Sequence, residues 1–264
     1  MARGLSRFWL WTAPVTVGIG AALVLAAGFA LALRGSAGTP LGPPRAQDSA
    51  RPRPTPAPRD GVFRILVVGD SLAKGTGDES GKGFAVNVLE AFKKKGPAEI
   101  TNLAVNGMES PDVLAIAESP NVRAIAARAD LILVSAGGND LSHGITRGPS
   151  PGDVADAVTA SRDRYAKSLR GILAALREAN PTARICVLAL YDPFGGDQAP
   201  GHLGASVILQ WNALIAETAL GFPNVSVIPT FDLFQGRPDR LSADHYHPNA
   251  QAYEEIAKRV LQVV

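Results

Sequence analysis

Short apolar runs alternate with longer amphipathic stretches along the chain from Val62 to the C-terminus. This alternation is typical of βα units, in which each buried strand is followed by a helix that packs on the sheet. Runs with so few polar residues are expected of parallel strands that are covered on both faces. The pattern predicts strands at Phe63–Val68, Ile100–Ala104, Leu131–Ala136, Ile185–Leu190 and Val225–Ile228.

The clearest predicted helix lies between the third and fourth strands, where apolar residues from Val154 to Leu176 recur at helical spacing, and Asn180-Pro181 ends it. Other helices are predicted at Phe84–Lys95, Val122–Arg128, Ala205–Leu220 and Asn249–Val263. Together these elements predict a three-layer α/β/α domain with a five-stranded, doubly wound, flavodoxin-like parallel sheet. In such sheets ligands bind outside the carboxyl ends of the strands, so the residues that follow each strand are the candidates for function.

The N-terminal part of the chain differs in composition from this domain. No charged residue occurs between Phe8 and Leu33, and a bilayer span needs about 20 apolar residues, so this run predicts a transmembrane anchor behind a short tail at 1–7. A cleaved signal peptide is the alternative, because the start is basic and Ala30-Leu31-Ala32 resembles a cleavage site. The apolar core exceeds the ~7–15 residues of such peptides, which favours an uncleaved anchor.

Residues 34–61 are rich in proline and have almost nothing apolar to bury, which indicates an extended, partly polyproline linker. Two arginines precede the predicted anchor and several follow it, so the positive-inside rule does not favour export of the domain that follows. Long domains are translocated largely regardless of charge. We therefore expect a single-pass protein with its N-terminus inside and the domain at 62–264 outside the cytoplasmic membrane.

Charge and cysteine content exclude some classes of function. The net charge of +2 is spread thinly, so no nucleic-acid-binding surface is indicated. The single cysteine, Cys186, lies in a predicted buried strand and cannot form an intrachain disulfide. His143 and His202 are expected in loops near the site, and the histidines show no convincing pair of metal ligands. No cofactor or metal is predicted.

Four corners of the predicted fold carry small and polar residues, three after strands and one before the last helix. Each alone would be an ordinary turn or helix cap, since such residues favour those positions. Asp244 precedes His247 by three residues, so its carboxylate can reach Nδ1 of that ring and leave Nε2 free as a base. Together the corners supply what acyl transfer needs, namely a hydroxyl, donors for an oxyanion and an Asp–His pair. The residues are Ser71, Gly107, Asn139, Asp244 and His247.

A second histidine in the last corner, His245, is the rival candidate for the base. It directly follows Asp244, and adjacent side chains generally diverge, so an Asp–His hydrogen bond is harder to form there. Pro248 disfavours the helical conformation at His247 and can begin the terminal helix in its first turn. The local sequence therefore favours His247.

With these blocks in this order, the chain from Val62 to its end resembles the SGNH, or GDSL-type, hydrolase superfamily, nearest to bacterial lysophospholipase-like and thioesterase-like members. The resemblance implies a five-stranded parallel sheet between helices. It also implies Ser71 as nucleophile, His247 as base oriented by Asp244, and an oxyanion hole formed by Ser71, Gly107 and Asn139. Position 73 is alanine, so the first corner is not the Gly-x-Ser-x-Gly elbow of α/β-hydrolases.

The sequence leaves the substrate open. Hydrolysis of lipidic or lysophospholipid-like carboxylic esters is favoured, because the anchor places the site near a membrane. O-deacetylation of cell-envelope glycans would use the same residues, and a non-catalytic surface-binding module is disfavoured by the intact site. Substrate-lining candidates, for which core packing is the alternative, are Leu72, Met108, Leu141, Tyr191 and Phe194.

Overall fold

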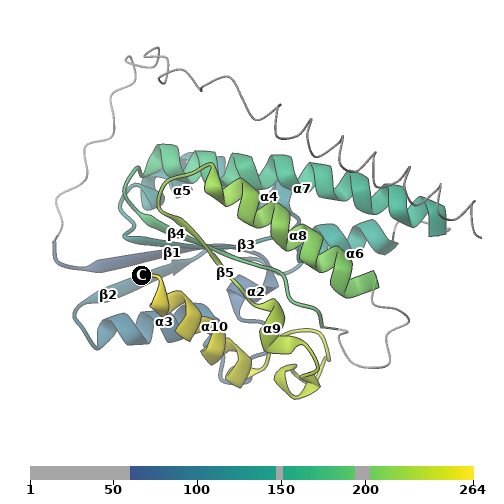
Figure 1. Ribbon diagram of the computed structural model, residues 1–264. Helices are drawn as coiled ribbons and strands as arrows, with labels where there is room; N and C mark the ends of the chain where they lie inside the picture. Colours follow the sequence, from purple (N-terminus) through teal and green to yellow (C-terminus); the bar gives the residue numbers. More distant parts are fainter. Residues whose placement is uncertain (1–59, 147–150, 194–202) are drawn as a thin grey trace, which may run out of the picture. The chain divides into compact units, whose positions relative to one another are not determined.

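The centre of the protein is a parallel sheet of five strands in the order β2-β1-β3-β4-β5 (Figure 1). The computed structural model describes residues 60–146, 151–193 and 203–264. This strand order is that of flavodoxin-like doubly wound sheets, so the predicted fold class is confirmed. The strands are β1 (Phe63–Gly69), β2 (Ala98–Asn102), β3 (Leu131–Ser135), β4 (Arg184–Leu188) and β5 (Val225–Ile228).

Helices cover both faces of the sheet and complete the three layers (Figure 1). One face carries α4 (Ser110–Glu118), α5 (Pro120–Ala126), α6 (Gly138–Thr146), α7 (Pro151–Ala179) and α8 (Leu203–Leu220). The other carries α2 (Ser71–Lys74), α3 (Gly83–Lys93), α9 (Phe231–Phe234) and α10 (Ala250–Gln262), with the 3₁₀ turn η1 (Pro238–Arg240) between the last two.

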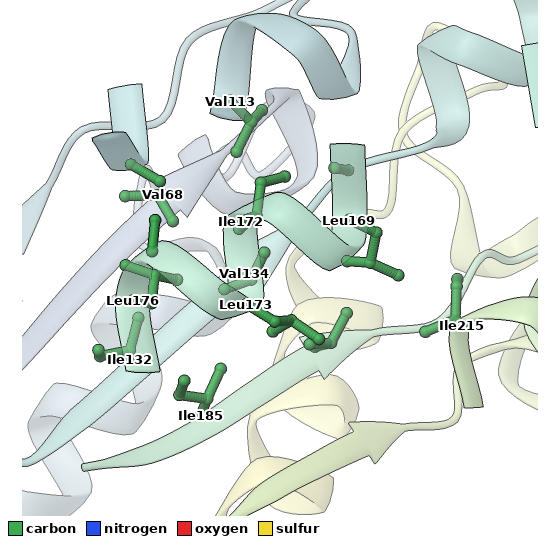
Figure 2. Close-up of a cluster of buried hydrophobic side chains, with 14 of the residues drawn as sticks. Val68, Val113, Ile132, Val134, Leu169, Ile172, Leu173, Leu176, Ile185 and Ile215 are labelled. Carbon is green, nitrogen blue, oxygen red and sulfur yellow. The ribbon is translucent and has the colours of Figure 1, made fainter. Parts of the chain in front are cut away.

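Side chains that alternate along each strand feed two separate cores. In β1, Leu66 and Val68 join the core beneath α7, whereas Ile65 and Val67 join the core beneath α3 and α10. Figure 2 shows the first core, where α7 lays apolar residues at helical spacing on the sheet. Four of these buried residues of α7, labelled in Figure 2, are Leu169, Ile172, Leu173 and Leu176.

Several boundaries differ from the predicted ones, and local capping explains two of these differences. The second strand ends at Asn102 rather than Ala104, because the Asn102 side chain accepts from the Ala104 N–H at 3.0 Å and turns the chain. Helix α5 begins at Pro120 rather than Val122, since Ser119 caps it and proline suits the first helical position.

The periodicity did not predict four helices, namely α2, α4, α6 and α9. Two of them have only four residues, which is too short to show a helical repeat. Helix α4 starts with a capping box between Glu109 and Asp112, in which a glutamate replaces the usual serine or threonine.

The predicted anchor at 8–33 and the linker at 34–61, apart from its last two residues, lie outside the described residues. Within the three described ranges, every helix falls short of the length or the hydropathy that crossing a bilayer requires.

The amino end of β4 is fixed by one buried amide, Asn180, which generates a prediction on stability. Its Nδ2 donates to the carbonyls of Ala126 and Ala129, both at 2.8 Å, and its Oδ1 accepts from the Ala183 N–H at 2.8 Å. We expect Asn180→Ala to lower the free energy of unfolding by about 2–4 kcal/mol, because buried partners lose their hydrogen bonds. Urea denaturation measures this. The control is Thr182→Ala at an exposed neighbour, and an equal loss in both variants would contradict the expectation.

Candidate active site

The first corner places Ser71 at the carboxyl end of β1, an interior strand between β2 and β3. Asp70 caps the short helix α2, and its Oδ1 accepts from the Leu72 N–H at 3.0 Å. Ser71 is the first residue of that helix, where backbone N–H groups have no intrahelical acceptor. Gly69 has φ +147°, and a Cβ there would collide with the carbonyl oxygen of Ser135. The close contact of β1 and β3 therefore requires glycine.

A buried carboxyl–hydroxyl pair ties this corner to β3. The Ser135 hydroxyl donates to Asp70 Oδ1 at 2.6 Å and accepts from the Ala73 N–H at 3.1 Å. Burial raises the pKa of Asp70, and the hydrogen bonds from Ser135 and Leu72 oppose that shift. The end of β3 thus holds the turn that carries Ser71.

The loop before α10 brings the base to this serine. His247 Nε2 lies 2.9 Å from Ser71 Oγ, and His247 Nδ1 lies 2.6 Å from Asp244 Oδ2. Both distances are those of hydrogen bonds. Three residues that the sequence placed in one site are therefore in direct contact.

The other oxygen of Asp244 holds the loop in shape. Oδ1 accepts from the Ser242 hydroxyl at 2.7 Å and from the N–H groups of Tyr246 and His247, each at 2.9 Å. Partial burial acts to raise the pKa of Asp244, but the hydrogen bonds, that of the His247 ring foremost, outweigh it and hold the pKa well below its usual range. Sequence analysis missed Ser242, whose place two residues before an aspartate in a turn is a weak local signal.

His245 has a different part in the same loop. Its side chain is exposed, and its backbone adopts φ +55°, the left-handed conformation that turns the chain between Asp244 and His247. The prediction that Pro248 starts the terminal helix was wrong. Helix α10 begins at Ala250 under an Asn249 cap, and Pro248 instead pairs with Leu241 in an isolated antiparallel bridge that closes the loop.

Gly77 lets the segment after α2 pack against the histidine loop. A Cβ at this position, where φ is +93°, would lie 2.6 Å from His247 Cβ and 2.8 Å from the Pro248 carbonyl oxygen. The neighbouring Thr76 carbonyl accepts from the buried hydroxyl of Tyr253 at 2.7 Å. Sequence analysis did not assign Gly77 to the site, because close approach of two loops leaves no mark in a local pattern.

The predicted oxyanion donors lie on the two corners that flank the first. β1 pairs with β2 and β3, so the corners after those strands are its neighbours. Gly107 occupies the turn after β2 with φ +79°, and the Val105 N–H of that segment donates to the Gly69 carbonyl at 2.9 Å. Asn139, near the start of α6, donates one Nδ2 hydrogen to the Met108 carbonyl at 2.8 Å. An amide group has two such hydrogens, so one remains for a ligand.

Two of the substrate-lining candidates lie in the hydrophobic cores instead. Leu72 and Leu141 are each 8% exposed, because both short helices turn these residues toward the sheet. Tyr191 supports the histidine loop, since its hydroxyl donates to the Tyr246 carbonyl at 2.7 Å. Its ring packs on that of Phe234, with 4.2 Å between the ring centroids.

Four other residues were predicted near the site. Met108 is half-buried against the first core. Phe194 and His202 lie outside the described residues. The expectation that His143 lies in a loop was wrong, since it belongs to the last turn of α6. Its side chain is half-exposed, and its Nδ1 lies 2.6 Å from Glu109 Oε1.

Comparisons with known proteins agree with this geometry. The model of the GDSL-like Lipase/Acylhydrolase family matches residues 67–255. The protein YpmR of Bacillus subtilis is 30% identical over 76% of this chain and 80% of its own length. The spore germination lipase LipC of Bacillus licheniformis is 26% identical over 75% of this chain and 95% of its own.

A solved structure shares the fold. The lipase Lip_vut3 from a goat rumen metagenome superimposes with a TM-score of 0.69 at 23% identity, over 76% of this chain and 97% of that one. The matched region spans the corners that carry Ser71, Asn139 and His247. The chain therefore belongs to the GDSL-like lipase/acylhydrolase family and is a carboxylic ester hydrolase.

Proposed function

We propose that the protein hydrolyses lipidic carboxylic esters through an acyl-enzyme on Ser71. The observation that carries this proposal is the continuous hydrogen-bonded chain from Ser71 Oγ through His247 to Asp244, at 2.9 and 2.6 Å. A serine hydroxyl is a weak nucleophile until an adjacent base accepts its proton, and a base is effective when a third group orients it. Asp244 is held ionised by its hydrogen bonds and fills that third place.

In the acylation step, Ser71 Oγ attacks the ester carbonyl carbon while His247 Nε2 accepts the hydroxyl proton. Negative charge then develops on the carbonyl oxygen, where the Ser71 N–H, the Gly107 N–H and the free Nδ2 hydrogen of Asn139 stabilise it. The tetrahedral intermediate collapses with cleavage of the C–O bond, and the imidazolium returns its proton to the leaving alcohol. Asp244 stabilises the positive ring throughout.

In the deacylation step, water replaces the alcohol. His247 Nε2 accepts a proton from the water as it attacks the acyl carbon, and the same donors stabilise the second oxyanion. Collapse releases the carboxylic acid and returns the proton to Ser71 Oγ. The chain's own residues account for every proton transfer in this cycle.

Two observations support lipidic acyl groups, with lysophospholipid-like esters as the favoured class. The uncharged run from Phe8 to Leu33 suits a membrane anchor that would keep the site near lipid. The relative LipC is described as a lipase. A series of esters from acetyl to long-chain acyl, with a lysophospholipid and an acetylated glycan beside it, tests the proposal. Turnover is expected to rise with the length of the acyl chain. A preference for the acetylated glycan would contradict the proposal and favour glycan O-deacetylation as the function.

Ser71→Ala should abolish ester hydrolysis and leave the fold intact, because it removes the attacking oxygen and few packing contacts. A fluorophosphonate probe should label the wild type at Ser71, as detected by mass spectrometry of the labelled peptide. Circular dichroism of the variant serves as the control for folding. Labelling that persists in Ser71→Ala would show that another residue is the nucleophile.

The two histidines of the last loop should differ sharply. His247→Ala is expected to lower kcat/KM by about 10³-fold or more, because the base of the triad is lost. His245→Ala is the matched control, and it should lose much less, since its side chain is exposed and only its backbone shapes the loop. Steady-state kinetics on both variants measure this. Equal losses would leave the base unassigned, and a larger loss at His245 would overturn the assignment.

We also propose that the catalytic domain lies outside the cytoplasmic membrane, tethered by residues 8–33 and the proline-rich linker. The short basic start before a long uncharged run supports this topology. Protease added to intact cells, or to spheroplasts where an outer membrane intervenes, should release a soluble active fragment by cutting the linker. Protection that is lost only on lysis would reverse the topology.

A further inference from the structure

Three successive residues, Met108 to Ser110 after β2, each contact a side chain of α6. Met108 accepts from Asn139 Nδ2 at 2.8 Å through its carbonyl. Glu109 lies 2.6 Å from His143 Nδ1 and also pairs with Arg164 of α7 at 3.0 Å. Ser110 contacts Asp140, the residue next to Asn139. The two segments that carry the flanking oxyanion donors are therefore fastened to each other.

The contact between Ser110 and Asp140 is the most buried of the three. Both residues are fully buried, with exposed fractions of 0%. The Ser110 N–H donates to Asp140 Oδ2 at 2.8 Å, and its hydroxyl donates to Oδ1 at 2.6 Å, so one serine satisfies both carboxylate oxygens. Burial raises the pKa of Asp140, while the two hydrogen bonds from Ser110 act against the shift.

The helices that carry this pair pack on α7. At Gly137, just before α6, a Cβ would lie 2.8 Å from the ring of Tyr165, so the corner rests directly on a fully buried side chain of α7. Helices α4 and α6 both pack on α7. The Ser110–Asp140 link therefore joins the segments of Gly107 and Asn139 where both helices pack on α7.

We propose that Asp140 and Ser110 are positioning residues that set the distance between the Gly107 N–H and the Asn139 amide in the oxyanion hole. The inference rests on the proposed function, since it assigns those two donors to the tetrahedral intermediate. Neither residue touches the reacting atoms. They act through Asn139, which adjoins Asp140 in α6, and through the turn of Gly107, which Ser110 follows by three residues.

Such a role predicts a particular kinetic signature. An oxyanion donor stabilises the tetrahedral state, so its displacement lowers kcat and leaves KM nearly unchanged. Asp140→Ala and Ser110→Ala are each expected to lower kcat by roughly 10- to 100-fold, less than the ~10²–10³-fold expected for loss of a donor itself in Asn139→Ala. Rates are expressed per active site titrated with a fluorophosphonate, so that unfolded protein does not count.

A conservative variant separates hydrogen bonding from charge. In Asp140→Asn, the amide oxygen can accept from the Ser110 N–H, and the amide nitrogen can donate to the Ser110 hydroxyl, which is also an acceptor. Asp140→Asn should therefore recover most of the kcat that Asp140→Ala loses. If Asp140 were needed only for its negative charge, Asp140→Asn would lose as much kcat as Asp140→Ala.

Asn180→Ala is the matched control, because it removes a buried polar side chain that also fastens two segments, but at the opposite edge of the sheet. It should lower the free energy of unfolding without lowering kcat per titrated site. An active wild type whose Asp140→Ala and Ser110→Ala variants keep the wild-type kcat would overturn the inference alone. Absence of Ser71-dependent turnover in the wild type would overturn the proposed function, and this inference with it.

Discussion

The hydrogen bond between Ser71 Oγ and His247 Nε2 joins residues that are 176 positions apart in the chain. It forms because the parallel sheet gathers the carboxyl ends of all its strands at one edge. β1 lies between β2 and β3 in the order 2-1-3-4-5, so its corner is flanked by the corners of those two strands. His247 follows β5 in the chain, so it must reach past β4 and β3 to the end of β1. The loop of residues 241–248 spans this gap, and its shape decides whether the chemistry is possible.

Two kinds of hydrogen bonding hold this edge together, and burial separates them. Asp70 and Asp140 are buried carboxyls, and each accepts from a buried serine on another corner. Loss of one such partner leaves an uncompensated polar group in a low-dielectric interior, so these contacts resist small displacements. Asp244 is half-exposed and depends instead on four donors from its own loop. The rigid part of the site is therefore inside the domain, whereas the base stands on a locally folded surface loop.

The same division explains which parts of the site the sequence could predict. The positions of the strands followed from apolar runs, and the corner residues Ser71, Asn139 and His247 followed from the short polar segments beside the predicted strands and helices, because both signals are local. His247 was favoured over His245 by its spacing from Asp244 and by the following Pro248, and the structure places its ring against Ser71. The contact at Gly77 could not be predicted, since it depends on how two distant loops meet. Leu72 and Leu141 were ambiguous for a related reason, because a four-residue or nine-residue helix does not reveal which side faces the core.

The opposite pKa shifts at the two kinds of carboxyl imply opposite effects of acid on the histidine loop and on the buried corners. The pKa of Asp244 is lowered in the folded protein, so its hydrogen bonds stabilise the fold above the unfolded pKa, and that stabilisation is lost as the pH falls. The pKa values of Asp70 and Asp140 are raised by burial, so their ionisation costs stability as the pH rises through the folded pKa, and acid relieves this cost. Solvent screening reduces the contribution of the half-exposed Asp244 but does not change its sign. Acidification therefore weakens the loop that orients His247 while the corners that carry Ser71 and the oxyanion donors gain in stability.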